Sequence, residues 1–425
     1  MTSPQQAPAA GADEPRDGPT LALREEVARL SRRFGADPEY TRGGGGNSSA
    51  KMDGVLYIKA SGQSLASLTG DALMPLRMEP LLELLAGGGG EPDLPGTDEI
   101  MRVALGARVE PADDRRPSVE CLFHALLPEP IVLHTHPTVV NALTCAKDGR
   151  RLAATLFGGE GLWVPYVDPG LPLARLIAAE RRDHEARTGG PAPRAMLLQN
   201  HGLIVTGESA DEVAVRSEHI VGAVRARLAA VGPVPVASSA PAGPSADAPL
   251  RATAALVPTI SSALRTLLTA DGRSKVVRFD GSPAALEIAS TSEGRELVGG
   301  GPLTPDQIVY TGSWPLWLGP IESDDPGAVA DTIRDRLQAH VAATGASPSV
   351  VVVAGLGLFV VADTDRFAAT ANEVILDAMR VAQGATRLGG VRVLAPEERR
   401  FIEEWEAEAY RRGVESAAPL RGKTT

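Results

Sequence analysis

The sequence predicts a two-domain protein of the α/β class. Short apolar runs of strand length alternate with longer amphipathic segments of helical period along most of the chain. The 425 residues exceed the usual length of one domain, and a stretch rich in Pro, Ala and Ser at 231–250 indicates a linker. We therefore expect a first domain at 19–230, a second domain at 251–413, and disordered tails at 1–18 and 414–425.

The first domain is expected to begin with a helix and a strand that flank a glycine-rich loop. Apolar residues at helical spacing from Leu21 to Phe34 predict the helix, and the run from Val55 to Lys59 predicts the strand. Between 73 and 85, Pro75 and Pro80 limit any helix to short pieces.

The remainder of the first domain continues this alternation. After a short helix that starts near Ser118 and Glu120, the expected elements are a helix at 139–146, a strand at 163–167, a helix at 173–187, strands at 195–198 and 202–205, and a helix at 211–230.

The second domain is expected to contain helices and strands like those of the first. We expect a helix at 253–268, short strands at 276–279 and 308–310, a helix at 329–343, apolar strands within 349–361, and a charged helix at 396–413.

Two stretches of the chain share one pattern, which suggests an internal repeat. Residues 194–206 and 349–361 each comprise an apolar strand, a break, a glycine, and a second apolar strand before an acid-capped helix. Aligning Gly202 with Gly357 places Leu356 opposite His201. We infer a degenerate second copy of the first domain that has lost this histidine; convergent strand–helix patterning is the alternative.

Composition excludes several classes of partner. The formal net charge is −11 and no cluster of Lys and Arg occurs, which argues against nucleic acid or an anionic membrane. Two cysteines form no disulfide framework. We find neither a bilayer-spanning apolar run nor a basic-then-apolar signal pattern, so we expect a cytoplasmic protein that binds a small molecule.

The best candidate for chemistry is the segment that ends in His134-Thr135-His136. Three apolar residues precede it and indicate a buried strand, on which side chains two residues apart share a face. In an isolated pair of this kind, the two histidines more often have ordinary hydrogen-bond partners and bind no metal. Together with Glu120 and His201, however, the pair makes a ligand set suited to zinc or another divalent transition metal. Such a metal polarises a carbonyl and stabilises an enediolate, with the carboxylate as acid or base.

Two turns rich in glycine are candidates for anion binding. Gly43 to Ser49 contains four consecutive glycines, and Ala60-Ser61-Gly62 follows the next strand. Backbone N–H groups in such turns can face an anion, although a flexible linker has the same composition. The first turn matches neither a Walker loop nor a Rossmann fingerprint, because Gly-Lys-Ser/Thr is missing and the loop precedes its strand.

These motifs together resemble the class II aldolase/adducin family. The matching stretches occur in the family's order over roughly 20–230: Gly45-Gly46-Asn47-Ser48-Ser49, Lys59-Ala60-Ser61-Gly62, Pro117-Ser118-Val119-Glu120, His134-Thr135-His136 and Asn200-His201-Gly202. The run 57–66 is most similar to rhamnulose-1-phosphate aldolase-type proteins, especially the aldolase part of bifunctional aldolase–dehydrogenases. The stretches 301–306 and 355–359 also resemble that subgroup. No dehydrogenase fingerprint follows in this chain.

The resemblance implies a three-layer α/β/α sandwich with a mainly antiparallel central sheet, and a homo-oligomer, dimer or tetramer. It implies that His134, His136 and His201 are zinc ligands and that Glu120 is the acid/base carboxylate. It implies a substrate-phosphate site formed by Gly46, Asn47, Ser61, Gly62 and Ser118.

The chain departs from the family's pattern at two points. Val119 stands where many members carry a second serine, so one phosphate hydroxyl is missing. No residue clearly matches the tyrosine that serves as proton donor in family aldolases; Tyr166 is a candidate, and a packed tyrosine is the alternative.

The implied reaction is cleavage of a ketose 1-phosphate to dihydroxyacetone phosphate and an aldehyde. Epimerases, dehydratases and decarboxylases of the same family are alternatives that use the same metal. A non-catalytic, adducin-like binding module is a further alternative, which the three histidines argue against.

Overall fold

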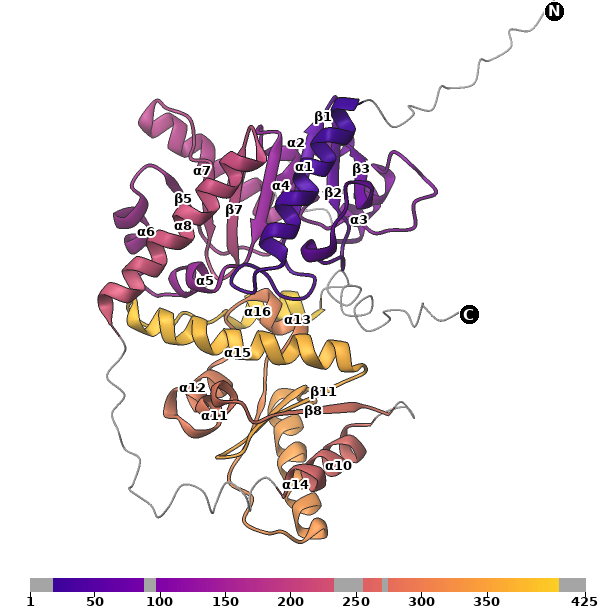
Figure 1. Ribbon diagram of the computed structural model, residues 1–425, viewed down its shortest axis with the longest axis vertical. Helices are drawn as coiled ribbons and strands as arrows, with labels where there is room; N and C mark the ends of the chain where they lie inside the picture. Colours follow the sequence, from indigo (N-terminus) through magenta and orange to yellow (C-terminus); the bar gives the residue numbers. More distant parts are fainter. Residues whose placement is uncertain (1–17, 88–96, 233–254, 270–273, 405–425) are drawn as a thin grey trace, which may run out of the picture.

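The computed structural model describes residues 18–87, 97–232, 255–269 and 274–404 (Figure 1). The predicted tails at 1–18 and 414–425 and the predicted linker at 231–250 lie almost entirely outside these residues. Gly18, which the prediction placed in the tail, is the first residue of helix α1.

A seven-stranded sheet forms the centre of the first half of the chain. Its strand order is β3-β2-β1-β4-β7-β6-β5, and every neighbouring pair is antiparallel except β5 and β6. This confirms the mainly antiparallel sheet. The strands are β1 (Asn47–Met52), β2 (Val55–Lys59), β3 (Leu73–Arg77), β4 (Ile131–Thr135), β5 (Gly161–Val164), β6 (Ala195–Leu198) and β7 (Gly202–Gly207).

Helices cover both faces of this sheet and give the expected three layers (Figure 1). In β2, Val55 and Tyr57 belong to one apolar cluster, whereas Leu56 and Ile58 belong to the other. Because both faces are buried, the strand is a continuous apolar run. The first face carries α1 (Gly18–Gly35), α5 (Thr138–Thr144), α6 (Gly149–Phe157) and α8 (Ala210–Val231); the second carries α2 (Met78–Ala86), α3 (Thr97–Gly106), α4 (Cys121–Leu126) and α7 (Leu171–Thr188).

A second, four-stranded sheet follows in the chain, with strand order β8-β11-β10-β9. Its strands are β8 (Val276–Asp280), β9 (Leu316–Leu318), β10 (Val350–Val353) and β11 (Gly357–Ala362). Its helices are α10 (Val257–Leu268), α11 (Pro283–Ser290), α12 (Ser292–Gly300), α13 (Pro305–Thr311), α14 (Pro326–Thr344), α15 (Asp365–Arg387) and α16 (Pro396–Glu404).

The second sheet repeats half of the first. Strands β8-β11-β10-β9 have the order and pairing senses of β4-β7-β6-β5. His134 pairs with Ile204, and at the corresponding place in the second sheet Phe279 pairs with Phe359. The position of His134 is thus taken by Phe279. By the same register, Gly281 takes the position of His136 and Leu356 that of His201, so all three imidazoles are missing from the copy.

One predicted element was wrong. Residues 308–310 belong to helix α13, because Thr304 caps it by accepting from the Gln307 N–H and Pro305 occupies its first turn. In the segment at 73–85, where only short pieces of helix were expected, strand β3 precedes the short helix α2. Pro75 is tolerated because β3 is an edge strand.

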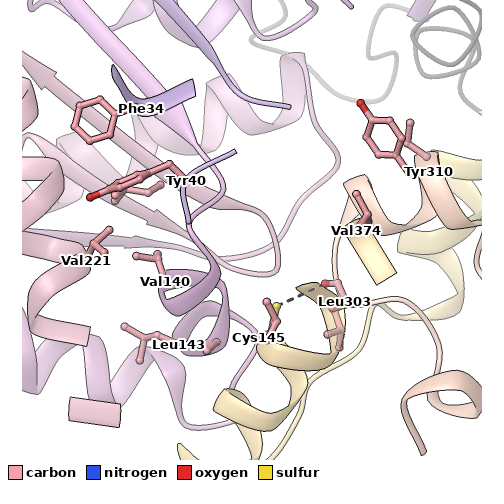
Figure 2. Close-up of a cluster of buried hydrophobic side chains, with 14 of the residues drawn as sticks. Phe34, Tyr40, Val140, Leu143, Cys145, Val221, Leu303, Tyr310 and Val374 are labelled. Atoms are coloured by element: carbon pink, nitrogen blue, oxygen red, sulfur yellow. Dashed lines mark hydrogen bonds between the residues drawn. The ribbon is translucent and has the colours of Figure 1, made fainter. Parts of the chain in front are cut away.

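The two halves of the chain pack through helix α15, which lies between the second sheet and helix α5 (Figure 1). A Cβ at Gly384 of α15 would lie 2.5 Å from the Cβ of Ala142. Beside this contact, Asp377 pairs with Arg42 at 2.7 Å and accepts from Thr138 Oγ1 at 2.7 Å. Figure 2 shows the same boundary, where the Cys145 thiol points to the Leu303 carbonyl at 3.7 Å.

We predict that Gly384→Ala destabilises the protein although alanine is the better helix former. The added methyl group cannot fit without separating α15 from α5, and overpacking of this kind costs about 1–3 kcal/mol. Denaturant unfolding of the full chain measures the change. Gly222→Ala in α8 is the matched control: no atom lies within 4 Å of its added Cβ, so it should leave stability unchanged or raise it by up to about 1 kcal/mol. Equal stability of the two variants would contradict the close helix contact.

Candidate metal centre

Three histidines from two paired strands converge at the end of the first sheet. His134 lies on β4, His136 directly follows that strand, and His201 lies in the turn between β6 and β7. Strands β4 and β7 pair along their length, which brings the turn beside the His-x-His segment. One nitrogen of each ring lies within 4.8 Å of the other two. The structure thus groups the residues that the sequence analysis grouped.

The turn that carries His201 has special backbone requirements. Asn200 has φ +53°, a conformation that asparagine tolerates better than most residues. A Cβ at Gly202 would lie 2.5 Å from the Thr135 carbonyl oxygen and 2.7 Å from the ring of His136. Only glycine lets the third histidine approach the other two this closely.

Hydrogen bonds fix the tautomers of two of the rings. Nδ1 of His134 lies 3.0 Å from the Leu203 carbonyl oxygen, and Nδ1 of His136 lies 2.5 Å from Asp306 Oδ2. Both partners are acceptors, so each Nδ1 carries a proton and each ring turns its Nε2 outward. Burial lowers the pKa of His134 to about 3, which keeps that ring neutral at pH 7.

The facing nitrogens favour a cation. Nε2 of His134 and Nε2 of His136 are 3.0 Å apart. Two lone pairs at this separation repel each other unless a positive charge lies near both. Neutral imidazoles arranged in this way are the donors that zinc and related divalent metals prefer.

Glu120 adds a carboxylate to the group. It occupies the N-cap position of α4, just before the first turn in which it was expected, and its N–H donates to Ser118 Oγ. Its Oε1 lies 3.3 Å from Nε2 of His201 and 3.6 Å from Nε2 of His134. Burial alone would raise the pKa of Glu120, but attraction to the rings, His134 first, lowers it overall.

A buried chain of hydrogen bonds orients Glu120 from behind. Asn47 Nδ2 donates to Glu120 Oε2, so the Asn47 Oδ1 atom faces His124 and accepts from its Nε2. His124 Nδ1 then accepts from the Ser49 hydroxyl at 2.7 Å. Burial lowers the pKa of His124 well below its usual value, so the ring stays neutral. One nitrogen therefore donates and the other accepts, as these hydrogen bonds require.

His124 lies one helical turn after Glu120 and was not among the candidate site residues. It is buried and stacks on Phe123 with ring centroids 4.7 Å apart, but its nitrogens also set the orientation of the Asn47 amide. The signal in the sequence was its spacing of four residues from Glu120, which places the two side chains on one helix face.

The residues expected to hold a phosphate line one cavity beside the histidines. The segment before α4 bridges to the end of β2, since Ser61 N donates to the Arg116 carbonyl and Ala60 pairs with Pro117. The lining residues include Gly46, Asn47, Ser61, Gly62, Ser118, Glu120, His136 and His201. His134 is fully buried and does not line the cavity.

Two cationic residues that the sequence analysis did not select also line this cavity. They are Lys59, which is 3% exposed, and Arg116. They supply local positive charge in a chain whose net charge is −11. Val119, which replaces a family serine, lines the cavity too.

Tyr166 does not reach this cavity. Its hydroxyl is buried, burial raises its pKa, and its ring lies 5.7 Å from the Arg392 guanidinium carbon. It is therefore a packed tyrosine, as the alternative stated.

The second half of the chain closes the cavity. Pro305 and Asp306, from the start of α13, are among its lining residues. Tyr310 of the same helix accepts a hydrogen bond from the Gly44 N–H at 3.0 Å. The site thus lies at the boundary of the two halves.

Comparison with known families agrees with this architecture. Residues 25–228 match the model of the class II aldolase and adducin N-terminal domain. Residues 251–343 and 339–411 match that of the aldolase class II second domain. The chain belongs to the class II aldolase and adducin family.

Individual relatives of this family differ in their described activities. The uncharacterized oxidoreductase YuxG of Bacillus subtilis (strain 168) is 25% identical over 415 residues, covering 91% of this chain and 58% of YuxG. The chain therefore spans little more than half the length of that relative. The 3-oxo-tetronate 4-phosphate decarboxylase of Haemophilus influenzae (strain ATCC 51907 / DSM 11121 / KW20 / Rd) is 28% identical over 209 residues, covering 47% of this chain and 84% of the enzyme.

Among solved structures, the N-terminal class II aldolase domain of a conserved Thermoplasma acidophilum protein is 26% identical, with a TM-score of 0.41. The match covers 53% of this chain and all of that domain.

Within the residues that the structure describes, no helix combines the length and apolarity needed to cross a bilayer.

We predict that His124 and Asn47 are energetically coupled. His124→Phe keeps the buried ring but leaves Asn47 Oδ1 unpaired, which costs about 1–3 kcal/mol of stability. A double-mutant cycle with Asn47→Ala, measured by denaturant unfolding of metal-free protein, should give a coupling energy of about 0.5–3 kcal/mol. His219→Phe, at an exposed position of α8, is the control. Additive effects of His124→Phe and Asn47→Ala would exclude the hydrogen-bonded chain.

Proposed function

We propose that this chain is a metal-dependent lyase that cleaves a ketose 1-phosphate, or a similar sugar phosphate, to dihydroxyacetone phosphate and an aldehyde. One observation carries the proposal: a cluster of three imidazoles and a carboxylate opens on the same cavity as two cationic residues and two glycine-containing turns. The cluster suits a metal, and the cationic residues and turns suit a phosphate.

His134, His136 and His201 are the proposed metal ligands. The converging Nε2 atoms support this assignment, because their lone pairs are stabilised by a shared cation. When bound, zinc or another divalent transition metal supplies Lewis-acid polarisation of substrate oxygens.

Glu120 is the proposed acid and base. Asn47 holds its Oε2, while its Oε1 faces His134 and His201. The carboxylate therefore lies within reach of a substrate hydroxyl beside the cluster, where it takes up or returns a proton.

Gly46, Asn47, Ser61, Gly62 and Ser118 are proposed to bind the substrate phosphate. Backbone N–H groups and hydroxyls donate hydrogen bonds to such an anion, and Lys59 and Arg116 neutralise its charge. Val119 removes one further hydroxyl, so the pocket relies more on these two cations.

Decarboxylation of a 3-oxo sugar-acid phosphate is the second candidate. The relatives described as 3-oxo-tetronate 4-phosphate decarboxylases are 28% identical, and the matches cover 82–84% of their length. Both reactions leave an electron pair on the carbon next to a carbonyl, so the same cluster serves either one.

Epimerase, dehydratase and adducin-like binding roles remain the further alternatives. A cytoplasmic location and a dimeric or tetrameric assembly remain predictions.

The proposed function predicts stoichiometric metal and a defined product. We expect about one divalent transition metal per chain in the wild type and loss of it in His201→Gln, measured by elemental analysis. The wild type should release dihydroxyacetone phosphate from one or more of a panel of ketose 1-phosphates. Carbon dioxide from 3-oxo acid phosphates, without dihydroxyacetone phosphate, would assign the decarboxylase instead. Protein without metal that turns over neither panel would contradict both.

Arg116 should discriminate phosphorylated from non-phosphorylated substrate. Arg116→Gln removes a positive charge that contacts the phosphate, and hydrogen bonds to charged groups contribute about 1.5–3 kcal/mol. We therefore expect kcat/KM for the phosphorylated substrate to fall about 10- to 100-fold, with little change for the free sugar. Arg102→Gln, at an exposed position of α3, is the control. An equal fall for both substrates would exclude a phosphate role.

A further inference from the structure

One segment of the second half of the chain touches three separate parts of the candidate metal centre. The Leu303 carbonyl accepts from Asn200 Nδ2 at 2.8 Å, next to His201. Asp306 accepts from Nδ1 of His136 at 2.5 Å. Tyr310 accepts from Gly44 in the glycine-rich loop. These contacts lie within the eight residues from Leu303 to Tyr310, so one short segment supports the site at three places.

The position of Asp306 is fixed by the start of helix α13. Thr304 accepts from the Gln307 N–H, and the Gln307 side chain in turn accepts from the Leu303 N–H at 2.8 Å. Pro305 restricts the backbone immediately before Asp306. The carboxylate therefore meets His136 from a preorganised turn, and both side chains are largely buried.

The two members of the His-x-His pair have different supports. His134 donates to a neutral backbone carbonyl of its own domain, whereas His136 donates to a carboxylate from the other half of the chain. A carboxylate behind a metal-binding imidazole fixes its tautomer and raises the basicity of the distal nitrogen more than a carbonyl does.

We propose that Asp306 is a positioning residue of the metal centre, through which the second domain sets the metal affinity and ligand geometry of the first. The second domain has no histidine at the three positions that correspond to His134, His136 and His201. It nevertheless supplies one carboxylate to the site in the first domain. The proposal rests on the assignment of His134, His136 and His201 as metal ligands.

The test uses Co²⁺ as a spectroscopic probe in the full-length chain. Affinity is measured by competition with a chelator, and ligand geometry by the visible d–d absorption of the bound ion. We expect Asp306→Ala to weaken Co²⁺ binding about 10- to 100-fold and to change the d–d spectrum. Asp306→Asn should show a smaller loss, because its amide oxygen can still accept from Nδ1. Asp365→Asn, at an exposed position of α15, should match the wild type.

A second variant separates positioning from domain docking. Asp377→Asn weakens a second buried ion pair that joins the described parts of the two halves, between Asp377 and Arg42. If it lowers Co²⁺ affinity and alters the spectrum as much as Asp306→Ala does, docking explains the effect and the proposal fails. Wild-type affinity and spectrum in Asp306→Ala would also overturn it.

Failure of the metal assignment gives a different result. If the wild type does not bind Co²⁺, or if His201→Gln binds it unchanged, the metal centre itself is refuted. If the wild type binds Co²⁺ through the histidines and Asp306→Ala leaves this binding unaltered, only the role of Asp306 is refuted.

Discussion

The structure depends on the approach of imidazole nitrogens to within hydrogen-bond distance in a buried place. The Nε2 atoms of His134 and His136 are 3.0 Å apart, and each ring has its proton engaged on the opposite side. Such an arrangement is unfavourable without positive charge between the lone pairs. It requires the pairing of β4 with β7, a glycine after His201, and supports behind the rings. The first domain provides the strand pairing, the glycine and the carbonyl behind His134, and the second half of the chain adds Asp306 behind His136.

Behind this cluster, buried polar side chains form a chain of hydrogen bonds in which each donor and acceptor is fixed. The carboxylate of Glu120 can only accept, so the Asn47 amide turns its nitrogen toward it and its oxygen toward His124. The neutral ring of His124 then determines the direction of the Ser49 hydroxyl. The charged carboxylate thus determines the orientation of three buried side chains. Each of them would lower the stability of the folded protein if its polar atoms were left unpaired.

The sequence predicted the metal-binding candidates because their spacing follows from local geometry. His134 and His136 share a strand face, and Asn200-His201-Gly202 has the residues that a tight turn requires. Asp306 was missed because its contact with His136 spans 170 positions and depends on how two domains dock. The strand predicted at 308–310 was wrong for a related reason: three apolar residues fit either structure, and the Thr-Pro-Asp cap that precedes them decides for helix. Lys59 was part of a matching stretch, but neither Lys59 nor Arg116 was assigned a role, because a single basic residue has no pattern of its own.

The second sheet has the same topology as half of the first but lacks its three histidines. Where the first sheet places His134 and His201, the copy has Phe279 and Leu356, and Phe279 packs on Phe359 with ring centroids 4.9 Å apart. Three buried imidazoles with no cation would leave polar atoms unpaired, whereas apolar side chains at these positions stabilise the sheet by packing. Strand order and register persist because helices cover both faces of the copy, with α10 and α14 on one side and α11 and α15 on the other. The copy lacks the histidines, but the start of its helix α13 reaches the histidine cluster of the first sheet through Asp306.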